Sequence, residues 1–283
     1  MTDAKQPFEG QGNGALSTKI GRERPIAVVT GATSGIGYEL ARLCALNGFD
    51  LVAVADNRKI KECAGEFSKL GANVRAVKAD LSIQSGVDCL YDAVKDLNRP
   101  IDALCANAGR GLGGAFLDQD WNEIADVIGT NITGTLYLVQ KIGRDMARRR
   151  HGRILVTGSI AGYVPGSYQA VYNGTKAFID NFTAALRNEL KDSGVTVTCL
   201  MPGATETEFF KKAGMLNTPI GSSKKDGALA VAVTGFDAMM RGKAQAVHGV
   251  KNRLQTLAAD ILPGSWTAEF HRMQAQSRGG LSR

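Results

Sequence analysis

Several marks of membrane, secreted and metal-binding proteins are missing from this 283-residue sequence. No uninterrupted apolar run approaches the roughly 18 to 20 residues that a bilayer-spanning helix needs, and the first 24 residues lack the apolar centre of a signal peptide. The five cysteines form an odd set without a CxxC pair, so we expect free, buried thiols rather than disulfides or a metal site. We therefore expect a cytoplasmic protein that does not enter membranes.

The positive charge of the sequence is not distributed as in a typical nucleic-acid-binding protein. The net charge is +7, and residues 241–283 contribute +5 of it, because seven Lys or Arg face only Asp260 and Glu269 there. Another basic group occupies residues 148–151. Both lack interleaved aromatic residues and recognisable nucleic-acid motifs, so they favour a solvated face, although an anionic partner stays open. We expect no nucleic-acid partner. The competing hypothesis of a basic, nucleic-acid-associated protein predicts binding that weakens steeply with salt.

Composition and periodicity indicate an α/β protein. With 44% hydrophobic and 22% charged residues, the sequence has ordinary globular usage, which excludes disordered and collagenous classes. Apolar runs rich in Val, Ile, Leu and Ala alternate with segments of helical periodicity, as in parallel strands that helices cover on both faces. The expected strands lie at residues 26–30, 51–55, 74–77, 101–106, 153–157 and 195–200. The longest expected helices lie at about 118–150 and 167–192.

These elements predict a single doubly wound parallel sheet of about seven strands. No internal repeat and no linker rich in Pro, Gly or Ser divides the sequence. We predict a flexible N-terminal arm at 1–24, one α/β domain at 25–250, and a helical C-terminal extension at 251–283 with a loose tail from Ser277. Ligands of such sheets bind outside the carboxyl ends of the strands, so functional residues should follow each strand directly.

A glycine loop follows the first expected strand. After Thr30 the sequence reads Gly31-Ala-Thr-Ser-Gly35-Ile-Gly37 and then enters a helical segment. Glycines at this junction let the backbone approach a pyrophosphate, whose negative charge the helix N-terminus favours. No lysine follows as in a P-loop, and Asp56 lies 19 positions after Gly37. The combination favours dinucleotide binding over a glycine turn without a ligand.

The spacing TGxxxGxG resembles that of the short-chain dehydrogenase/reductase family, and the resemblance extends over residues 25–250. It implies a Rossmann-like catalytic domain that binds NAD(P) without a metal. Asn-Ala-Gly after the fourth strand, Asp-Leu after the third and PGxxxT after the sixth also match the family's motifs. The implied cofactor-binding residues are Gly31, Ser34, Gly35, Ile36, Gly37, Asp56, Asp80, Leu81, Asn107, Ala108, Gly109, Tyr172, Lys176, Pro202, Gly203, Thr205 and Thr207.

The family's catalytic motif, Tyr-x-x-x-Lys, occurs three times and therefore does not identify the site alone. The three tyrosines are Tyr91, Tyr137 and Tyr172. Residues four apart share a helix face, so such pairs are common on helix surfaces. Only Tyr172 has a serine, Ser159, thirteen residues earlier and directly after an expected strand. We expect the first two pairs to decorate helices and the third to be catalytic.

The resemblance implies an enzyme that interconverts an alcohol and a carbonyl by hydride transfer. In family terms, Tyr172 exchanges a proton with the substrate oxygen, Ser159 binds that oxygen, Lys176 holds the nicotinamide ribose and lowers the phenol pKa, and Asn131 anchors a water. Asn131 matches the family's asparagine on the helix after the fourth strand. A dinucleotide-sensing protein of the same fold without significant turnover is the alternative.

Two parts of the sequence, Asp56 and the segment 208–225, concern the cofactor preference and the substrate. Asp56 favours NAD because a carboxylate repels a 2′-phosphate, although it lies one position after the family's usual place and Arg58 is near. The segment 208–225 contains Phe209, Phe210, Met215 and Leu216, which either contact a hydrophobic substrate or pack on the body. The family implies a small-molecule alcohol or carbonyl substrate and a homodimer or homotetramer.

Overall fold

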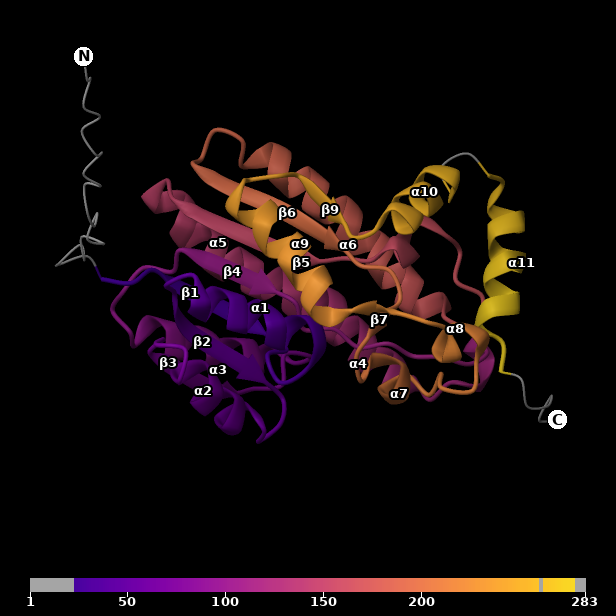
Figure 1. Ribbon diagram of the computed structural model, residues 1–283, viewed down its shortest axis with the longest axis horizontal. Coiled ribbons are helices and arrows are strands. Elements are labelled where there is room, and N and C mark those ends of the chain that lie inside the picture. Colours follow the sequence, from indigo (N-terminus) through magenta and orange to yellow (C-terminus); the bar gives the residue numbers. More distant parts are fainter. Residues whose placement is uncertain (1–22, 260–261, 278–283) are drawn as a thin grey trace, which may run out of the picture.

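The computed structural model describes residues 23–259 and 262–277. Within these ranges seven parallel strands form one sheet in the order β3-β2-β1-β4-β5-β6-β9 (Figure 1). The strands are β1 (Ile26–Thr30), β2 (Asp50–Ala55), β3 (Val74–Lys78), β4 (Ala103–Ala106), β5 (Gly152–Thr157), β6 (Val195–Met201) and β9 (Gln245–Val247). The predicted doubly wound parallel sheet is confirmed. Residues 1–22 of the arm predicted at 1–24, and residues 278–283 of the tail predicted from Ser277, lie outside the described residues.

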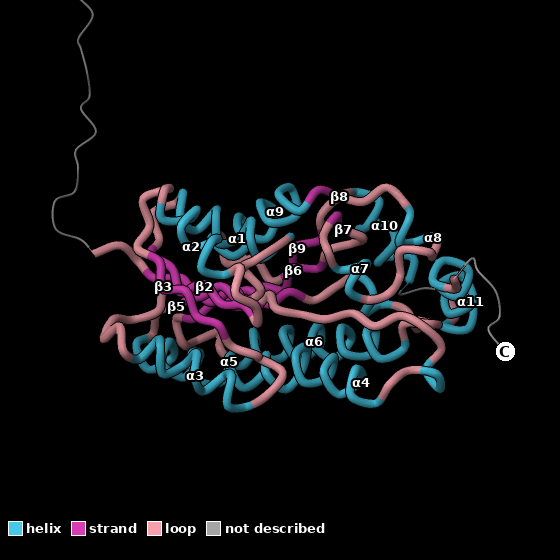
Figure 2. Tube along the Cα trace, turned by 90° about the horizontal axis from the view of Figure 1, so that it is seen from below, coloured by secondary structure: helices cyan, strands magenta, loops and turns pink. Residues whose placement is uncertain are grey.

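Helices cover both faces of the sheet (Figure 2). One layer consists of α1 (Gly35–Leu46), α2 (Ile60–Ser68) and α9 (Ala228–Met240). The other layer consists of α3 (Gln84–Lys95), α4 (Trp121–Ile128), α5 (Thr135–Arg149) and α6 (Ala170–Glu189). Leu40 and Phe67 pack into the core of the first layer, and Leu90, Ile142 and Ile179 into that of the second. Each such side chain stabilises the fold by about 1.5–3 kcal/mol through its burial.

The order of the strands opens a crevice above the centre of the sheet. Every residue of β1, β2 and β4 is buried, as the continuous apolar runs predict for strands covered on both faces. The chain builds outward from β1 to β3 and then returns to place β4 on the other side of β1. The carboxyl ends of β1 and β4 therefore border the point where the strand order reverses, which is where ligands bind in such sheets.

The long helical segment expected at 118–150 differs in detail from the structure. A π-helical turn, Gly129–Gly134, separates α4 from α5 and contains Asn131. A Cβ atom on Gly129 would come within 2.6 Å of the Ser82 carbonyl oxygen, and one on Gly134 would overlap that of Leu81. The glycines let this turn pack closely against the loop after β3. Such π turns are often found at functional sites.

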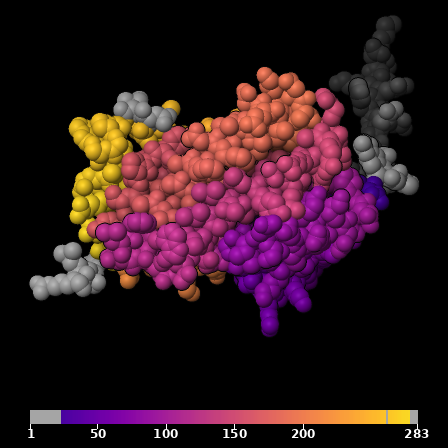
Figure 3. Space-filling model, turned by 180° about the vertical axis from the view of Figure 1, so that it is seen from behind, coloured from indigo at the N-terminus to yellow at the C-terminus, as the bar shows by residue number. Residues whose placement is uncertain are grey.

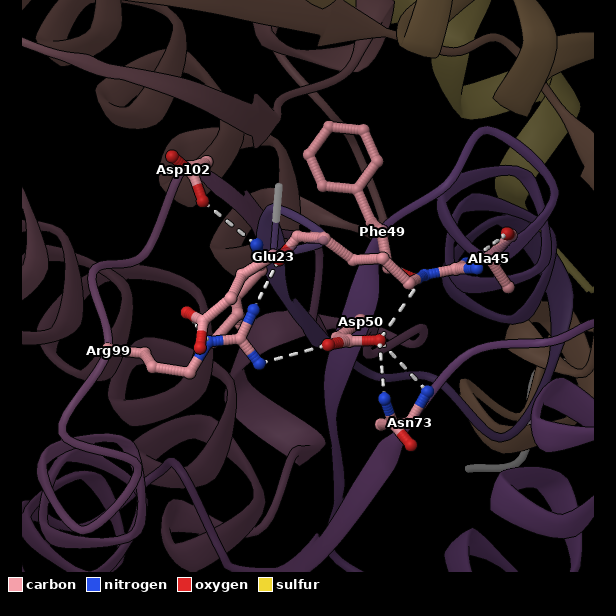
Figure 4. A network of polar contacts seen from close by, with 9 residues as sticks. Glu23, Ala45, Phe49, Asp50, Asn73, Arg99 and Asp102 are labelled. Carbon is pink, nitrogen blue, oxygen red and sulfur yellow. Dashed lines mark hydrogen bonds and ion pairs between the residues drawn. The ribbon is translucent and has the colours of Figure 1, made fainter. Parts of the chain in front are cut away.

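A network of ion pairs and hydrogen bonds lies at the amino-terminal edge of the sheet, opposite the crevice (Figure 4). Asp50, at the start of β2, is only 5% exposed and forms ion pairs with Arg24 at 3.3 Å and with Arg99 at 3.0 Å. Its carboxylate also accepts a hydrogen bond from the Asn73 backbone N–H at 3.0 Å. Arg24 also donates to the carbonyl oxygens of Ala45 and Phe49, so it belongs to the folded body although the predicted flexible arm included it.

The C-terminal part of the chain lies at one end of the molecule, away from β1 to β3 (Figures 1 and 3). It includes α10 (Val250–Ala259) and α11 (Gly264–Ala275), and α11 packs on α8 (Pro219–Ser222). The segment after β6 contains α7 (Phe209–Lys212) and α8, next to a two-stranded sheet of β7 (Thr205–Glu206) and β8 (Asp226–Gly227). In the described ranges no helix is both long and apolar enough to cross a membrane.

Candidate active site

The glycine loop after β1 is shaped to bring a ligand close to the start of α1. Gly31 and Gly35 have φ angles of +69° and +55°, which residues with side chains rarely adopt. A Cβ atom on Gly37 would overlap the Gly31 carbonyl oxygen and the Asn107 side-chain amide, so only glycine fits there. The side chain of Ser34 does not cap α1, and the first turn of this helix contains no acidic residue. The N-terminus of α1 can therefore receive a negatively charged group.

Asn107 joins the carboxyl ends of three strands directly below this loop. Its Nδ2 donates to the Thr30 carbonyl oxygen at 3.1 Å, and its Oδ1 accepts from the Thr157 hydroxyl at 3.1 Å. The backbone N–H groups of Asn107 and Ala108 both donate to Thr30 Oγ1, at 3.0 and 2.9 Å. Thr30 was not among the predicted site residues. The sequence feature that could have identified Thr30 is its position as the single polar residue at the end of an otherwise apolar strand.

Asp56, at the end of β2, takes part in an ion-pair bridge at the rim. Arg110 donates to Asp56 Oδ2 and to Asp126 Oδ2, both at 3.2 Å, so its guanidinium connects the end of β2 with α4. Asn57 donates to Asp56 Oδ1 at 2.9 Å. Because the bridging side chains are about 37–52% exposed, each ion pair is weak, about 0–1 kcal/mol, and exchanges easily with a ligand.

Asp80 and Leu81 follow β3 on the same rim. Asp80 Oδ1 accepts hydrogen bonds from the backbone N–H and the hydroxyl of Ser82, at 2.9 and 2.7 Å. Burial opposes ionisation of this carboxyl, but the two hydrogen bonds from Ser82, together with the nearby Arg110, outweigh it and lower the pKa of Asp80. Asp80 is therefore ionised and held by its own turn.

Ser159 and Tyr172 meet at the carboxyl end of β5. The Ser159 hydroxyl accepts from the Ala161 N–H at 3.1 Å and donates to the Pro202 carbonyl oxygen at 3.4 Å. Tyr172 lies in the first turn of α6. Burial raises the pKa of its phenol to about 12, and a hydrogen bond with Ser159 acts in the opposite direction. With these groups alone, the phenol is protonated at neutral pH and can donate a proton or a hydrogen bond.

Lys176 is one helical turn after Tyr172 and is 5% exposed. Its Nζ donates to the Thr157 carbonyl oxygen at 2.8 Å and lies 5.9 Å from the centre of the Tyr172 ring. Burial lowers the pKa of Lys176, while the negative charge of Asp180 opposes this effect. The strand end thus orients the ammonium beside the phenol.

Asn131 lies behind these three residues in the π-helical turn. Its Nδ2 donates to the Arg110 carbonyl oxygen and to Thr175 Oγ1, both at 2.9 Å, and its Oδ1 accepts from the Arg110 N–H at 2.8 Å. A Cβ atom on Gly109 would lie 3.3 Å from Asn131 Oδ1 and 3.5 Å from Lys176 Nζ. The amide oxygen and the ammonium therefore both border the space next to Gly109. The structure therefore brings all four predicted catalytic residues together.

Asp180, a further turn along α6, was missed by the sequence reasoning. Its Oδ1 accepts from the Ser159 N–H at 3.3 Å and from Cys199 Sγ at 3.4 Å. Its Oδ2 is buried without a hydrogen-bond partner in the described chain. A Cβ atom on Gly158 would overlap Oδ1, so the backbone encloses this carboxylate. Burial raises the pKa of Asp180 to about 6, although Lys176 lowers it.

The other two Tyr-x-x-x-Lys segments lie on the surfaces of α3 and α5. Tyr137 donates to Asp88 at 2.8 Å, Tyr91 donates to Asp145 at 2.8 Å, and Lys141 Nζ lies between the two rings at 4.6 and 4.7 Å from their centres. None of these residues lines the cleft described below. As expected, these pairs lie on helices away from the strand ends, and Tyr91, Tyr137 and Lys141 in addition connect α3 with α5.

One large cleft of about 1180 Å³ runs across the carboxyl ends of the strands. All the predicted cofactor-binding residues line it, and so do Ser159, Tyr172 and Lys176, whereas Asn131 contacts it only through its neighbours. The cleft is also lined by Phe209 of α7 and by Phe270 and His271 of α11. His271 and Arg110 were not predicted as site residues.

The segment 208–225 packs on the body and also lines the cleft. Phe210 and Met215 are buried in a small cluster with Ala275 of α11, so they pack on the body. Phe209 lines the cleft, and its ring centre is 5.0 Å from that of Tyr172. Leu216 is 54% exposed. This segment therefore forms a wall that touches the candidate catalytic phenol directly.

The cysteines and acidic residues do not form a metal site in the part of the chain that the structure describes. No group of three or more His, Cys, Asp or Glu side chains there could hold a metal ion. All five cysteines are free; Cys89 is exposed and the other four are buried. The expectation of buried thiols therefore holds except at Cys89, which lies on the solvent side of α3.

Comparisons with known proteins agree with the fold. The family model for short chain dehydrogenases matches residues 25–215. The chain is 33% identical to an uncharacterised oxidoreductase from Staphylococcus epidermidis over 201 residues, which are 71% of this chain and 84% of that protein.

Two solved structures have similar folds. A short-chain dehydrogenase from Sphingobium yanoikuyae in complex with NADPH is 27% identical, with a TM-score of 0.75 over 84% of this chain and 93% of that one. A 3-oxoacyl-[acyl-carrier protein] reductase from Brucella melitensis in complex with NAD is 25% identical, with a TM-score of 0.68 over 80% of this chain and 96% of that one.

Proposed function

The chain belongs to the short-chain dehydrogenase family and is an oxidoreductase of that family, and from this premise we propose that it interconverts an alcohol and a carbonyl with NAD(P). One observation carries the proposal: Ser159, Tyr172 and Lys176 converge on the same cleft as the glycine loop. A proton donor, a hydroxyl and an ammonium then face the place where a nicotinamide would lie.

The residues of the cleft fit a dinucleotide. The α1 N-terminus and the Gly31–Gly37 loop would hold the pyrophosphate, and Asp56 would accept hydrogen bonds from the adenosine ribose. Lys176 and Thr207 would orient the nicotinamide half; Thr207 touches the loop, since a Cβ atom on Gly35 would lie 2.5 Å from its Cγ2. When bound, the nicotinamide supplies or accepts the hydride.

Tyr172 moves the proton in this proposal. Ser159 binds the carbonyl oxygen by a hydrogen bond and places it beside the phenol. Because burial raises the pKa of Tyr172 to about 12, the phenol keeps its proton at neutral pH and is present in the acid form that carbonyl reduction requires. Proton removal from an alcohol requires a lower phenol pKa, which the nearby ammonium of Lys176 promotes.

Asn131 and Lys176 complete a proton path in this proposal. Both Nδ2 protons of Asn131 are used by Arg110 and Thr175, which leaves its Oδ1 with one accepted bond and capacity for another. Since this oxygen and Lys176 Nζ flank Gly109, a water between them would connect the ammonium with the interior of the π-helical turn. Asn131 is thus the proposed water anchor.

We propose NAD as the preferred cofactor, on the position of Asp56. Its carboxylate would repel a 2′-phosphate, but Arg110 is already paired with it and neutralises part of that charge. Similar proteins of known structure were solved with NADPH and with NAD, so the family alone does not choose. We further propose a small-molecule substrate and a homodimer or homotetramer that assembles through the long helices α5 and α6.

The decisive experiment compares Tyr172→Phe with Tyr137→Phe, which alters another Tyr-x-x-x-Lys segment. We expect Tyr172→Phe to lose at least about a hundredfold in kcat on a ketone panel with NADH or NADPH. NADH affinity should stay within about twofold in both variants, and Tyr137→Phe should keep its activity. Full turnover by Tyr172→Phe contradicts the assignment. Dinucleotide binding by the wild type without turnover of any ketone or alcohol supports the alternative of a sensing protein.

A further inference from the structure

The cleft contains a buried histidine that the family match, residues 25–215, does not include. We propose that His271 is a specificity-determining residue whose Nε2 accepts a hydrogen bond from a hydroxyl or amide N–H of the substrate, on a part of the substrate other than the reacting carbonyl. The proposal rests on the proposed function, because it assigns the substrate class of the same cleft.

The position of His271 is set by contacts between α11 and the loop that precedes α6. The imidazole is 7% exposed and lines the cleft. Its Nδ1 lies 2.9 Å from the Ser167 carbonyl oxygen, and the Ser167 hydroxyl donates to the Ala268 carbonyl oxygen at 3.0 Å. Two hydrogen bonds thus join α11 to the loop between Ser159 and Tyr172.

These contacts also determine the protonation state of the ring. A carbonyl oxygen can only accept, so Nδ1 must carry the proton that it shares with Ser167. Burial lowers the pKa of His271, and the hydrogen bond to the Ser167 carbonyl opposes this only in part. The imidazole is therefore neutral at neutral pH. Its Nε2 then has a lone pair and no proton, which makes it a hydrogen-bond acceptor.

The Nε2 atom is free to meet a ligand. No hydrogen bond to it is formed by any residue in the ranges 23–259 and 262–277, and it is absent from the buried polar atoms without partners there. Nε2 is therefore accessible to solvent, and His271 is among the residues that line the cleft. An acceptor that a bound substrate covers selects for a donor, because an apolar group against it would leave the acceptor unpaired.

The surroundings narrow the substrate further. Phe209, Phe270 and Leu254 line the cleft near the C-terminal segment and favour an apolar body between the two polar ends of the substrate. The substrate class is thus an apolar ketone or alcohol with a hydroxyl or amide N–H at a second position.

The test uses aryl ketones with a para side chain of graded length that ends in a hydroxyl, a methoxy or an ethyl group. A hydroxyl donates and accepts, a methoxy oxygen only accepts, and an ethyl group does neither. At the best length, we expect wild-type kcat/KM for the hydroxyl ketone to exceed that for the methoxy ketone about fivefold or more. Equal values for the two ketones overturn the proposal.

Variants locate the effect at His271. His271→Phe keeps a ring of similar size without an acceptor, and should bring the hydroxyl-to-methoxy ratio to about one while the ethyl ketone changes less than about twofold. His271→Gln can still donate to Ser167 and accept from the substrate, so it should retain part of the preference. His151→Phe removes an exposed histidine at the amino end of β5 and should change nothing. A preference that persists in His271→Phe refutes the assignment.

If the proposed function is wrong, the outcome differs from the failure of the His271 assignment: none of the ketones is reduced, the ethyl ketone included. The same three ketones are then titrated into the complex of the protein with NADH, and dissociation constants replace kcat/KM. A hydroxyl preference in binding that disappears in His271→Phe supports the subsite without the catalysis, and equal dissociation constants overturn it.

Discussion

Replacing Asp180 by asparagine should change how the stability of the protein depends on pH. Burial raises the pKa of Asp180 to about 6 from an ordinary value of 3.8. The contribution of such a carboxyl to stability is fully present at pH values where it is protonated in both the folded and the unfolded protein. That contribution is lost as the pH rises from about 4 through the folded pKa near 6, because the unfolded chain releases its proton first.

The size of the effect follows from the shift. A difference of about two pKa units corresponds to about 3 kcal/mol of unfolding free energy, at about 1.4 kcal/mol per unit. The asparagine of the Asp180→Asn variant would keep an acceptor for the Ser159 N–H and the Cys199 thiol. It would also place an amide where Oδ2 now lies without a partner among the described residues, at a cost of about 1–3 kcal/mol that does not depend on pH.

The assay is urea unfolding of wild type and Asp180→Asn at several pH values between about 4 and 8. Relative to wild type, the unfolding free energy of the variant should rise by about 2.5 kcal/mol between pH 4 and pH 7 and then stay constant. Asp192→Asn, which changes an exposed carboxylate in the turn after α6, controls for the loss of a charge. A difference that is the same at every pH refutes the reasoning.

Three further predictions concern the dinucleotide half of the cleft. Gly37→Ala should abolish NADH binding in a fluorescence titration while the circular dichroism spectrum stays close to wild type, because its Cβ would overlap Gly31 and Asn107. Thr30→Val leaves two backbone N–H groups without their acceptor, and urea unfolding should show a loss of about 2 kcal/mol or more. Asp56→Ala should weaken NADH binding and strengthen NADPH binding, each about tenfold, and an unchanged ratio of the two dissociation constants would reject Asp56 as the selecting residue.

The parts of the fold and site that follow local rules were predictable from the sequence. Central strands of a covered parallel sheet read as continuous apolar runs, and β1, β2 and β4 do so. Residues four apart share a helix face, so Tyr172 and Lys176 had to lie together. The position of Ser159 directly after a strand separated this pair from the two similar pairs on α3 and α5. Each of these signals lies within a short segment of the chain.

The parts that depend on packing between distant segments were not predictable. Asp180 shares a face of α6 with Lys176, but its hydrogen bond with the Ser159 N–H depends on how α6 packs against the end of β5. His271 reaches the cleft through its contact with Ser167, which is 104 residues away in the sequence. The π-helical turn around Asn131 results from the close approach of two glycines to the loop after β3, and periodicity alone describes that segment as one long helix. No pattern within a single segment records such contacts.

The division of the cleft between two stretches of the chain has a consequence for how this protein can diversify. The residues proposed to exchange the proton and hold the dinucleotide all precede residue 208, whereas α11 supplies His271 and Phe270 from the last described helix. Substitutions confined to the cleft-facing residues of α11 can therefore alter the substrate end of the cleft without replacing any residue proposed for the chemistry or for the dinucleotide.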